Sequence, residues 1–187
     1  MHSWITLIAS IVIGGLVLMS FGQFNNDVTR DLYLDTLDNN AYGNLDEVVR
    51  LIEYDFSRIG LGINDPKQAV LIQVDSTDLR YNLDSDGNGV IETMRYYLGS
   101  TSEANSTQNP RDRYLYRVVN GTSQIISSGL TDFKIRYYDA AGNASTNLSA
   151  IRTFVVTVTM ESEMLYDNQY PKMFWTGRIT PPSLMLR

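Results

Sequence analysis

The first hydrophobic feature of the chain is an apolar run at its N-terminal end. Residues 4–21 include no charged side chain. As an α-helix this run would cover roughly 27 Å, close to the hydrocarbon thickness of a bilayer. Three interpretations are open: a cleavable secretory signal, a simple membrane anchor, and a helix that enters the membrane first and is later buried among copies of itself. A signal normally carries a basic residue before its apolar core, and no Lys or Arg precedes residue 4.

Small residues within this run favour contact with other helices. Ser10, Gly14 and Gly15 would allow a neighbouring helix to approach closely. We therefore expect residues 1–24 to form an apolar helix for a membrane or a filament core. Residues 25–62 predict a helical stalk with a break near residues 39–44, where Asn and Gly residues gather.

After that expected break, apolar residues return at helical spacing, which predicts a second, amphipathic helix. Asn44 is suited to its N-cap and Gly60 to its end. We expect the apolar face of this helix to lie on a β-rich domain. That face consists of Leu45, Val48, Val49, Ile52, Phe56 and Ile59.

Beyond Gly62 the period changes from helical to alternating, which is typical of β-strands. The turns between the alternating segments are short and rich in Asn, Gly, Asp and Ser, so they favour an antiparallel sheet over βαβ units. The predicted fold class is α+β, with residues 63–187 forming a β-rich head. The expected strands cover residues 69–74, 79–83, 90–98, 114–119, 132–137, 154–160 and 174–179, and residues 99–112 are expected to form an exposed loop.

Composition narrows the possible functions. The 187 residues carry a net charge of -6 and include no cysteine and one histidine, His2. Disulfides and thiolate catalysis are therefore excluded, and catalysis by a Ser-His-Asp triad or a multi-histidine metal site nearly so. An acidic chain is also poorly matched to nucleic acid. We expect a protein that is not an enzyme and has no nucleic-acid partner and no small-molecule substrate; a glycoside hydrolase with two carboxylates is the enzymatic alternative.

One motif carries the oxygen ligands of a calcium loop. Asp84, Asp86 and Asn88 occupy the first, third and fifth places of the loop, and Gly89 supplies the turn at the sixth. The twelfth place holds Arg95, where an EF-hand has a glutamate, and the following residues alternate like a strand. The sequence therefore predicts an EF-like loop in a β setting that binds a structural Ca²⁺.

Two further residues belong to this predicted site. Val90 would contribute its backbone carbonyl, and a bound cation would compensate the charge of Glu92 on an otherwise apolar strand face. Asp78 or Asp112 is a candidate for the remaining ligand. The alternative is a hairpin turn built on Asp-Gly and Asn-Gly, which needs no metal.

Tyrosines form the other unusual feature of the composition. Adjacent residues of a strand point to opposite faces, so one member of each pair, Tyr96-Tyr97 and Tyr137-Tyr138, should face outward. Exposed tyrosines are typical of interfaces. We expect Tyr97 and Tyr138 to lie at contacts between subunits, although β-sheets also favour tyrosine for reasons of packing alone.

In several features together the chain resembles the type IV pilin and pseudopilin superfamily, and most of all a minor pilin. The N-terminal apolar helix opens with Ile5-Thr6-Leu7-Ile8, and a second helix and a β-rich head follow. Position 5 departs from the family, because pilins carry a glutamate there. The head resembles minor pilins in five short motifs: Leu83-Asp84-Ser85-Asp86-Gly87, Arg95-Tyr96-Tyr97-Leu98, Leu115-Tyr116-Arg117, Phe133-Lys134-Ile135-Arg136-Tyr137-Tyr138 and Ile151-Arg152.

This resemblance implies a function. In the family the N-terminal helices bundle into a filament core, the heads decorate the outside, and the heads often hold calcium. We accordingly expect a structural subunit of an extracellular or cell-surface filament, which inserts in the inner membrane before assembly and has other copies of itself as partners. The alternatives are a minor pilin or pseudopilin that primes or tips a type IV pilus or type II secretion fibre, and a membrane-tethered, monomeric adhesin or ligand-binding domain.

Overall fold

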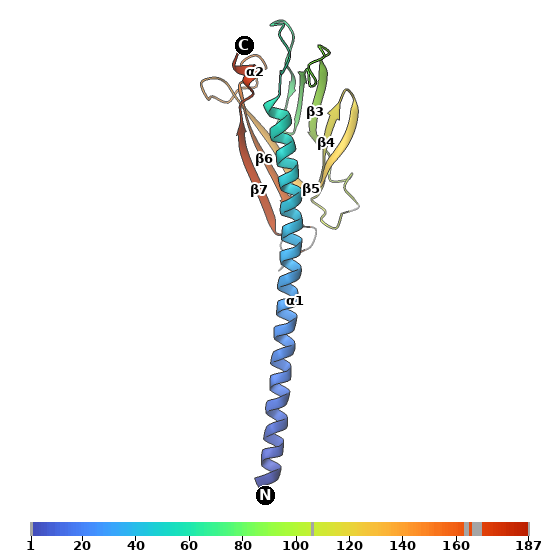
Figure 1. The fold of residues 1–187 in the computed structure, drawn as a ribbon, viewed down its shortest axis with the longest axis vertical. Coiled ribbons are helices and arrows are strands. Elements are labelled where there is room, and N and C mark those ends of the chain that lie inside the picture. The colour runs from blue at the N-terminus through green and yellow to red at the C-terminus, as the bar shows by residue number, and fades with distance from the viewer. Residues whose placement is uncertain (1, 106, 163–164, 166–169, 187) are drawn as a thin grey trace. The chain divides into compact units, whose positions relative to one another are not determined.

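A computed structural model describes residues 2–105, 107–162, 165 and 170–186, and for residues 2–3 and 33–41 it describes the backbone alone. The chain forms two compact units, Met1–Asn40 and Ala41–Arg187. The first unit is helical. The second joins the C-terminal part of the same helix to a β-sheet (Figure 1). The coarse expectation of an N-terminal helix and a C-terminal antiparallel sheet is confirmed.

A single helix, α1 (His2–Ser57), takes the place of the two helices that the sequence predicts. The predicted break near residues 39–44 is wrong, because the helix continues through them. Asn44 lies in the middle of the helix and is not an N-cap. Asn and Gly cost a helix roughly 0.5–1 kcal/mol each. Because helix extension adds a hydrogen bond per residue and the following turns bury an apolar face, that local cost is outweighed.

The sheet is an antiparallel meander in which strands adjacent in sequence are adjacent in space. A short helix, α2 (Pro182–Met185), follows it. The strands are β1 (Leu71–Val74), β2 (Asp78–Leu83), β3 (Glu92–Leu98), β4 (Arg113–Val119), β5 (Thr122–Tyr138), β6 (Thr153–Glu161) and β7 (Lys172–Ile179).

Strand β5 joins the two parts of this sheet. Its first half pairs with β4, from Thr122 to Leu130, and its second half pairs with β6, from Leu130 to Tyr138. Irregular register on both sides of Leu130 marks the transition. The sequence predicts only the second half of β5, because the first half is polar and largely exposed and lacks an alternating apolar pattern.

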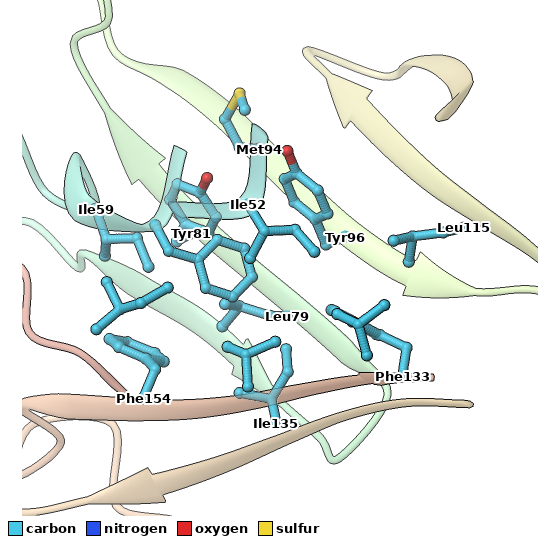
Figure 2. Close-up of a cluster of buried hydrophobic side chains, with 14 of the residues drawn as sticks. Ile52, Ile59, Leu79, Tyr81, Met94, Tyr96, Leu115, Phe133, Ile135 and Phe154 are labelled. Atoms are coloured by element: carbon cyan, nitrogen blue, oxygen red, sulfur yellow. The ribbon is translucent and has the colours of Figure 1, made fainter. Parts of the chain in front are cut away.

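The core lies between one face of the sheet and the C-terminal part of α1. The helix residues Val48, Ile52 and Phe56 are almost fully buried, as the helical spacing predicts. Figure 2 shows Ile52 and Ile59 in one cluster with buried side chains from β2, β3, β4, β5 and β6. Each large apolar side chain buried in this way stabilises the fold by about 1.5–3 kcal/mol. Burial of this face holds the second unit together.

A buried ion pair fixes the helix against the sheet. Asp55 lies on the apolar face of α1 and is only 1% exposed. Its Oδ2 accepts a hydrogen bond from the Tyr96 hydroxyl of β3 and, at 2.6 Å, one from Nε of Arg117 of β4. The Tyr81 hydroxyl of β2 donates to the Asp55 carbonyl at 3.3 Å. Burial, together with the Asp55 charge, holds the pKa of Tyr96 well above its usual value, so this hydroxyl stays a donor.

Replacement of the buried carboxylate should destabilise the second unit strongly. Asp55→Ala leaves the Arg117 guanidinium partly buried without its counter-charge, so we expect the free energy of unfolding to fall by about 3–5 kcal/mol. The matched control is Asp46→Ala, which removes an exposed ion pair with Arg50 on the same helix and should cost less than about 1 kcal/mol. Urea unfolding of the full-length protein in detergent, followed by near-UV circular dichroism, measures both; equal effects would contradict the assigned role of Asp55.

Candidate functional site

The predicted calcium loop connects β2 to β3. Leu83 at the end of β2 pairs with Glu92 at the start of β3, so residues 84–91 form the turn of a hairpin. Gly87 and Gly89 have φ angles of 76° and 83°, a conformation that favours glycine. Ile91, the last residue of this turn, packs against the core.

Asp84 is the centre of the loop. Its side chain is 5% exposed, and its two carboxylate oxygens accept three backbone N–H groups. Oδ1 accepts those of Gly87 at 2.8 Å and Asn88 at 3.1 Å, and Oδ2 accepts that of Gly89 at 2.9 Å. The Asp84 carboxylate therefore holds the backbone of the loop in its turn.

The other predicted ligands also bond within the loop. Asp86 accepts the backbone N–H of Asn88 at 3.2 Å and its side-chain amide at 2.8 Å. The Asn88 side-chain oxygen accepts the N–H of Val90 at 2.7 Å, and Glu92 Oε2 accepts that of Ser85 at 2.7 Å. The Val90 side chain is 63% exposed. The structure thus brings four of the five predicted residues into one hydrogen-bonded turn through their side chains, and the fifth through its backbone.

The chemistry of this donor set suits a hard cation only in part. A carboxylate has about four acceptor positions, and Asp84 uses three of them on its own backbone. Across the part of the chain that the structure describes, no three His, Cys, Asp or Glu side chains form a group that could hold a metal ion. A Ca²⁺ ion here would take free carboxylate positions, Asn88, a carbonyl and water.

Neither proposed additional carboxylate lies at the loop. Asp78 is at the opposite end of β2, about 17 Å along the strand from Leu83, and it binds Arg95 through two hydrogen bonds. Asp112 precedes β4 at the end where Leu115 pairs with Leu98, again the far end of β3 from the loop. The expectation that either residue completes a calcium shell is wrong. Because the strands alternate in direction, both residues lie at the ends of the strands that are far from the loop.

The loop is attached to the end of α1. The N–H of Asp84 donates to the Leu61 carbonyl at 2.8 Å, and that of Gly60 donates to the Asn82 carbonyl at 3.1 Å. Arg58 donates to the carbonyl of Ser85. A Cβ atom on Gly62 would lie 2.5 Å from the Cβ of Asp84, so only glycine allows this close approach. The loop and the helix end therefore form one connected region, a link that the sequence motif alone does not indicate.

The paired tyrosines point to opposite faces of their strands, as predicted. Tyr96 and Tyr137 are buried, whereas Tyr97 and Tyr138 are half-buried on the other face. Tyr97 stacks on Tyr116 with ring centroids 4.7 Å apart, and the Arg178 guanidinium lies over Tyr138. Both outward rings therefore already have partners within the chain.

The N-terminal part of α1 exposes many large apolar side chains. One helical stretch in the described residues, Trp4–Leu32, is long and apolar enough to cross a membrane, and none of its most apolar part is buried. Ile5, Ile11 and Leu18 are each more than half exposed. A Cβ atom at Gly14 or Gly15 would meet only open space. Monomeric soluble proteins rarely expose an apolar surface of this extent, so this segment requires lipid or protein around it.

Comparison with known proteins adds no relative: no protein-family model matches the chain, and no curated protein matches its sequence.

Loss of the central carboxylate should destabilise the hairpin even without a metal. We expect Asp84→Ala to lower the free energy of unfolding by about 2–4 kcal/mol in the presence of a chelator, because three loop N–H groups lose their acceptor. Asp86→Ala, at an exposed position of the same loop, should cost less than about 1 kcal/mol. Thermal and urea unfolding of both variants measure the difference; an Asp84→Ala variant as stable as Asp86→Ala would show that Asp84 does not organise the loop.

Proposed function

We propose that this protein is a structural subunit of an extracellular filament that polymerises through the N-terminal part of α1. The observation that carries the proposal is the exposure of the Trp4–Leu32 segment, whose most apolar part has no buried residue in the structure described. The head has a hydrophobic core of its own, and no residue of this segment belongs to that core. We therefore infer that the segment packs against other molecules. The resemblance to pilins suggests that these molecules are copies of the same chain, arranged in a helical filament.

The energetics favour such an assembly once the segment leaves the lipid. Each large apolar side chain that becomes fully buried contributes about 1.5–3 kcal/mol, so transfer of the whole segment from water into a helical bundle is worth on the order of tens of kcal/mol. Gly14 and Gly15 provide a place where neighbouring helices can approach backbone to backbone. In this proposal the membrane holds the segment before assembly, and sister helices hold it afterwards.

A membrane-tethered monomer is the second candidate, because the same exposed segment also suits an anchor. The two functions differ in what Gly14 and Gly15 do. A lipid-anchored helix tolerates leucine at both positions, since leucine is as apolar as the lipid chains, whereas a packed bundle loses its close contacts.

Replacement of both glycines tests this difference. We expect Gly14→Leu/Gly15→Leu to insert in membranes as the unchanged protein does but to form few or no fibres in sedimentation and negative-stain microscopy. The matched control, Val12→Leu, adds apolar volume to the same exposed helix and should form normal fibres. Failure of the unchanged protein to form any fibre would reject the filament, and normal fibres from the double variant would reject packing through the glycines.

We further propose that the Asp84–Glu92 loop binds a structural Ca²⁺ through Asp84, Asp86, Asn88, the Val90 carbonyl and Glu92. The alternation of oxygen ligands supports this proposal, and the attachment of the loop to the end of α1 gives the ion a structural role. A cation at the C-terminal end of a helix also lies at the negative end of its dipole. The ion would hold the hairpin turn and the helix end together in the head.

Calcium should therefore stabilise the head. With a dissociation constant of roughly 10⁻⁴–10⁻³ M, typical of extracellular modules, about 10 mM Ca²⁺ should add about 1.4–2.7 kcal/mol to the free energy of unfolding and raise the Tm. Asp86→Ala should abolish this response, whereas Asp132→Ala, which removes an acid outside the loop, should retain it. An identical Tm in chelator and in about 10 mM Ca²⁺ would reject the site.

A further inference from the structure

A shallow groove crosses the outer face of β2, β3 and β4, the face whose side chains alternate with those of the core. Its volume is about 630 Å³, within the range of ligand sites in proteins. Because the three strands are interior strands of the sheet, the floor of the groove is rigid. The residues that line it include Arg80, Arg95, Tyr97, Val118, Asn120 and Ser123.

Two arginines face each other across neighbouring strands in this groove. Arg80 of β2 and Arg95 of β3 are direct partners in the strand register. Like charges at such positions destabilise a sheet. Asp78 neutralises Arg95 through a bidentate pair, but no acidic side chain within the described ranges forms an ion pair with Arg80. In a protein of net charge -6, this is a local excess of positive charge.

Arg95 is held in place by its neighbours. Its Nε donates to Asp78 Oδ1 at 2.9 Å and its Nη2 to Oδ2 at 2.5 Å, while its guanidinium lies over the Tyr97 ring at 4.4 Å. Tyr97 in turn stacks on Tyr116, whose hydroxyl donates to Glu103. An arginine fixed on several sides is pre-organised, so a ligand would bind it with little loss of side-chain entropy.

The groove offers hydrogen-bond donors that the described part of the chain leaves without an acceptor. The Arg80 guanidinium, Nη1 of Arg95, the Asn120 side-chain amide nitrogen and the Ser123 hydroxyl have no hydrogen-bond acceptor among the residues that the structure describes. The described residues that line the groove include no carboxylate, and the neighbouring Asp78 is paired with Arg95. A surface with charged and neutral donors and few acceptors favours a ligand rich in anionic and neutral oxygen atoms.

We propose that this groove binds an acidic saccharide that carries carboxylate or sulfate groups. Arg80 and Arg95 would bind the acidic group, Asn120 and Ser123 the ring hydroxyls, and Val118 with the edge of Tyr97 the apolar face of the sugar ring. The saccharide is a ligand of the head and is not converted. This inference stands whether the head is carried by a filament or by a single membrane-anchored chain.

Two other classes of ligand fit the groove less well. A peptide that adds to a sheet needs a free strand edge, and β2, β3 and β4 each have paired neighbours on both sides. A nucleotide base needs an open aromatic face, but Arg95 and Tyr116 cover Tyr97. A saccharide needs neither feature.

Titration calorimetry with full-length protein in detergent tests the proposal. The protein is expressed without N-glycosylation, because Asn120 lies in an Asn-Gly-Thr sequon. The probes are a uronate oligosaccharide, a sulfated oligosaccharide of equal length, and a neutral oligosaccharide as control. We expect at least one acidic probe to bind and the neutral probe to bind at least tenfold more weakly. Arg80→Gln should weaken acidic binding by about tenfold or more, while Arg136→Gln, which removes an exposed arginine outside the groove, should change it less than about twofold.

Five results would overturn the proposal. Binding of neither acidic probe, or equal binding of the neutral one, would reject an acidic saccharide. Equal losses in Arg80→Gln and Arg136→Gln would show general electrostatic attraction instead of a site. Displacement of the oligosaccharide by inorganic sulfate at the same concentration would reduce the site to a simple anion contact. Self-association that Arg80→Gln abolishes, with no saccharide binding, would make a second copy the occupant.

Discussion

An exposed apolar helix is the constraint that the remaining features of this protein must satisfy. The most apolar part of the Trp4–Leu32 segment has no buried residue in the structure described, and water is an unfavourable environment for so much contiguous apolar surface. The segment therefore needs an apolar environment, which in the proposed function is lipid at first and copies of itself later. The head does not cover this segment, because the core of the head forms without these residues.

The head is organised around the C-terminal part of α1. Apolar burial supplies most of the stability, but apolar contacts alone tolerate some sliding of a helix on a sheet. Asp55 removes that freedom, since its hydrogen bonds with Tyr96 and Arg117 are satisfied in one position only. A few residues further on, Gly60 and Gly62 allow the chain to turn close to Asp84. Polar contacts thus link the end of the helix to the hairpin loop and to β2, β3 and β4. A substitution that removes one of these contacts would disturb the others.

Periodicity in the sequence predicts the elements that have a clear apolar face. The alternation around Phe133 and the helical spacing around Ile52 predict a strand and a helix that the structure contains. The first half of β5 lacks such a face, and the uninterrupted α1 contradicts local propensity, so both depend on contacts and cooperativity that a sequence window does not include. A signal for the buried ion pair was present: Asp55 falls at a core-facing position of the amphipathic pattern, where a charge requires a partner. The identity of that partner, Arg117, depends on the strand order. For the candidate calcium loop the motif predicts which residues gather, but the strand directions exclude the carboxylates expected to complete it.

One cryo-electron microscopy reconstruction of the protein purified in its native state would show what surrounds the N-terminal part of α1. We expect a helical filament whose core is a bundle of these helices, with residues 4–24 in contact with the same residues of neighbouring subunits and with the β heads outside. A reconstruction or mass measurement that finds single chains, each with this segment in lipid or detergent and no helix from another copy beside it, would rule out the proposed filament.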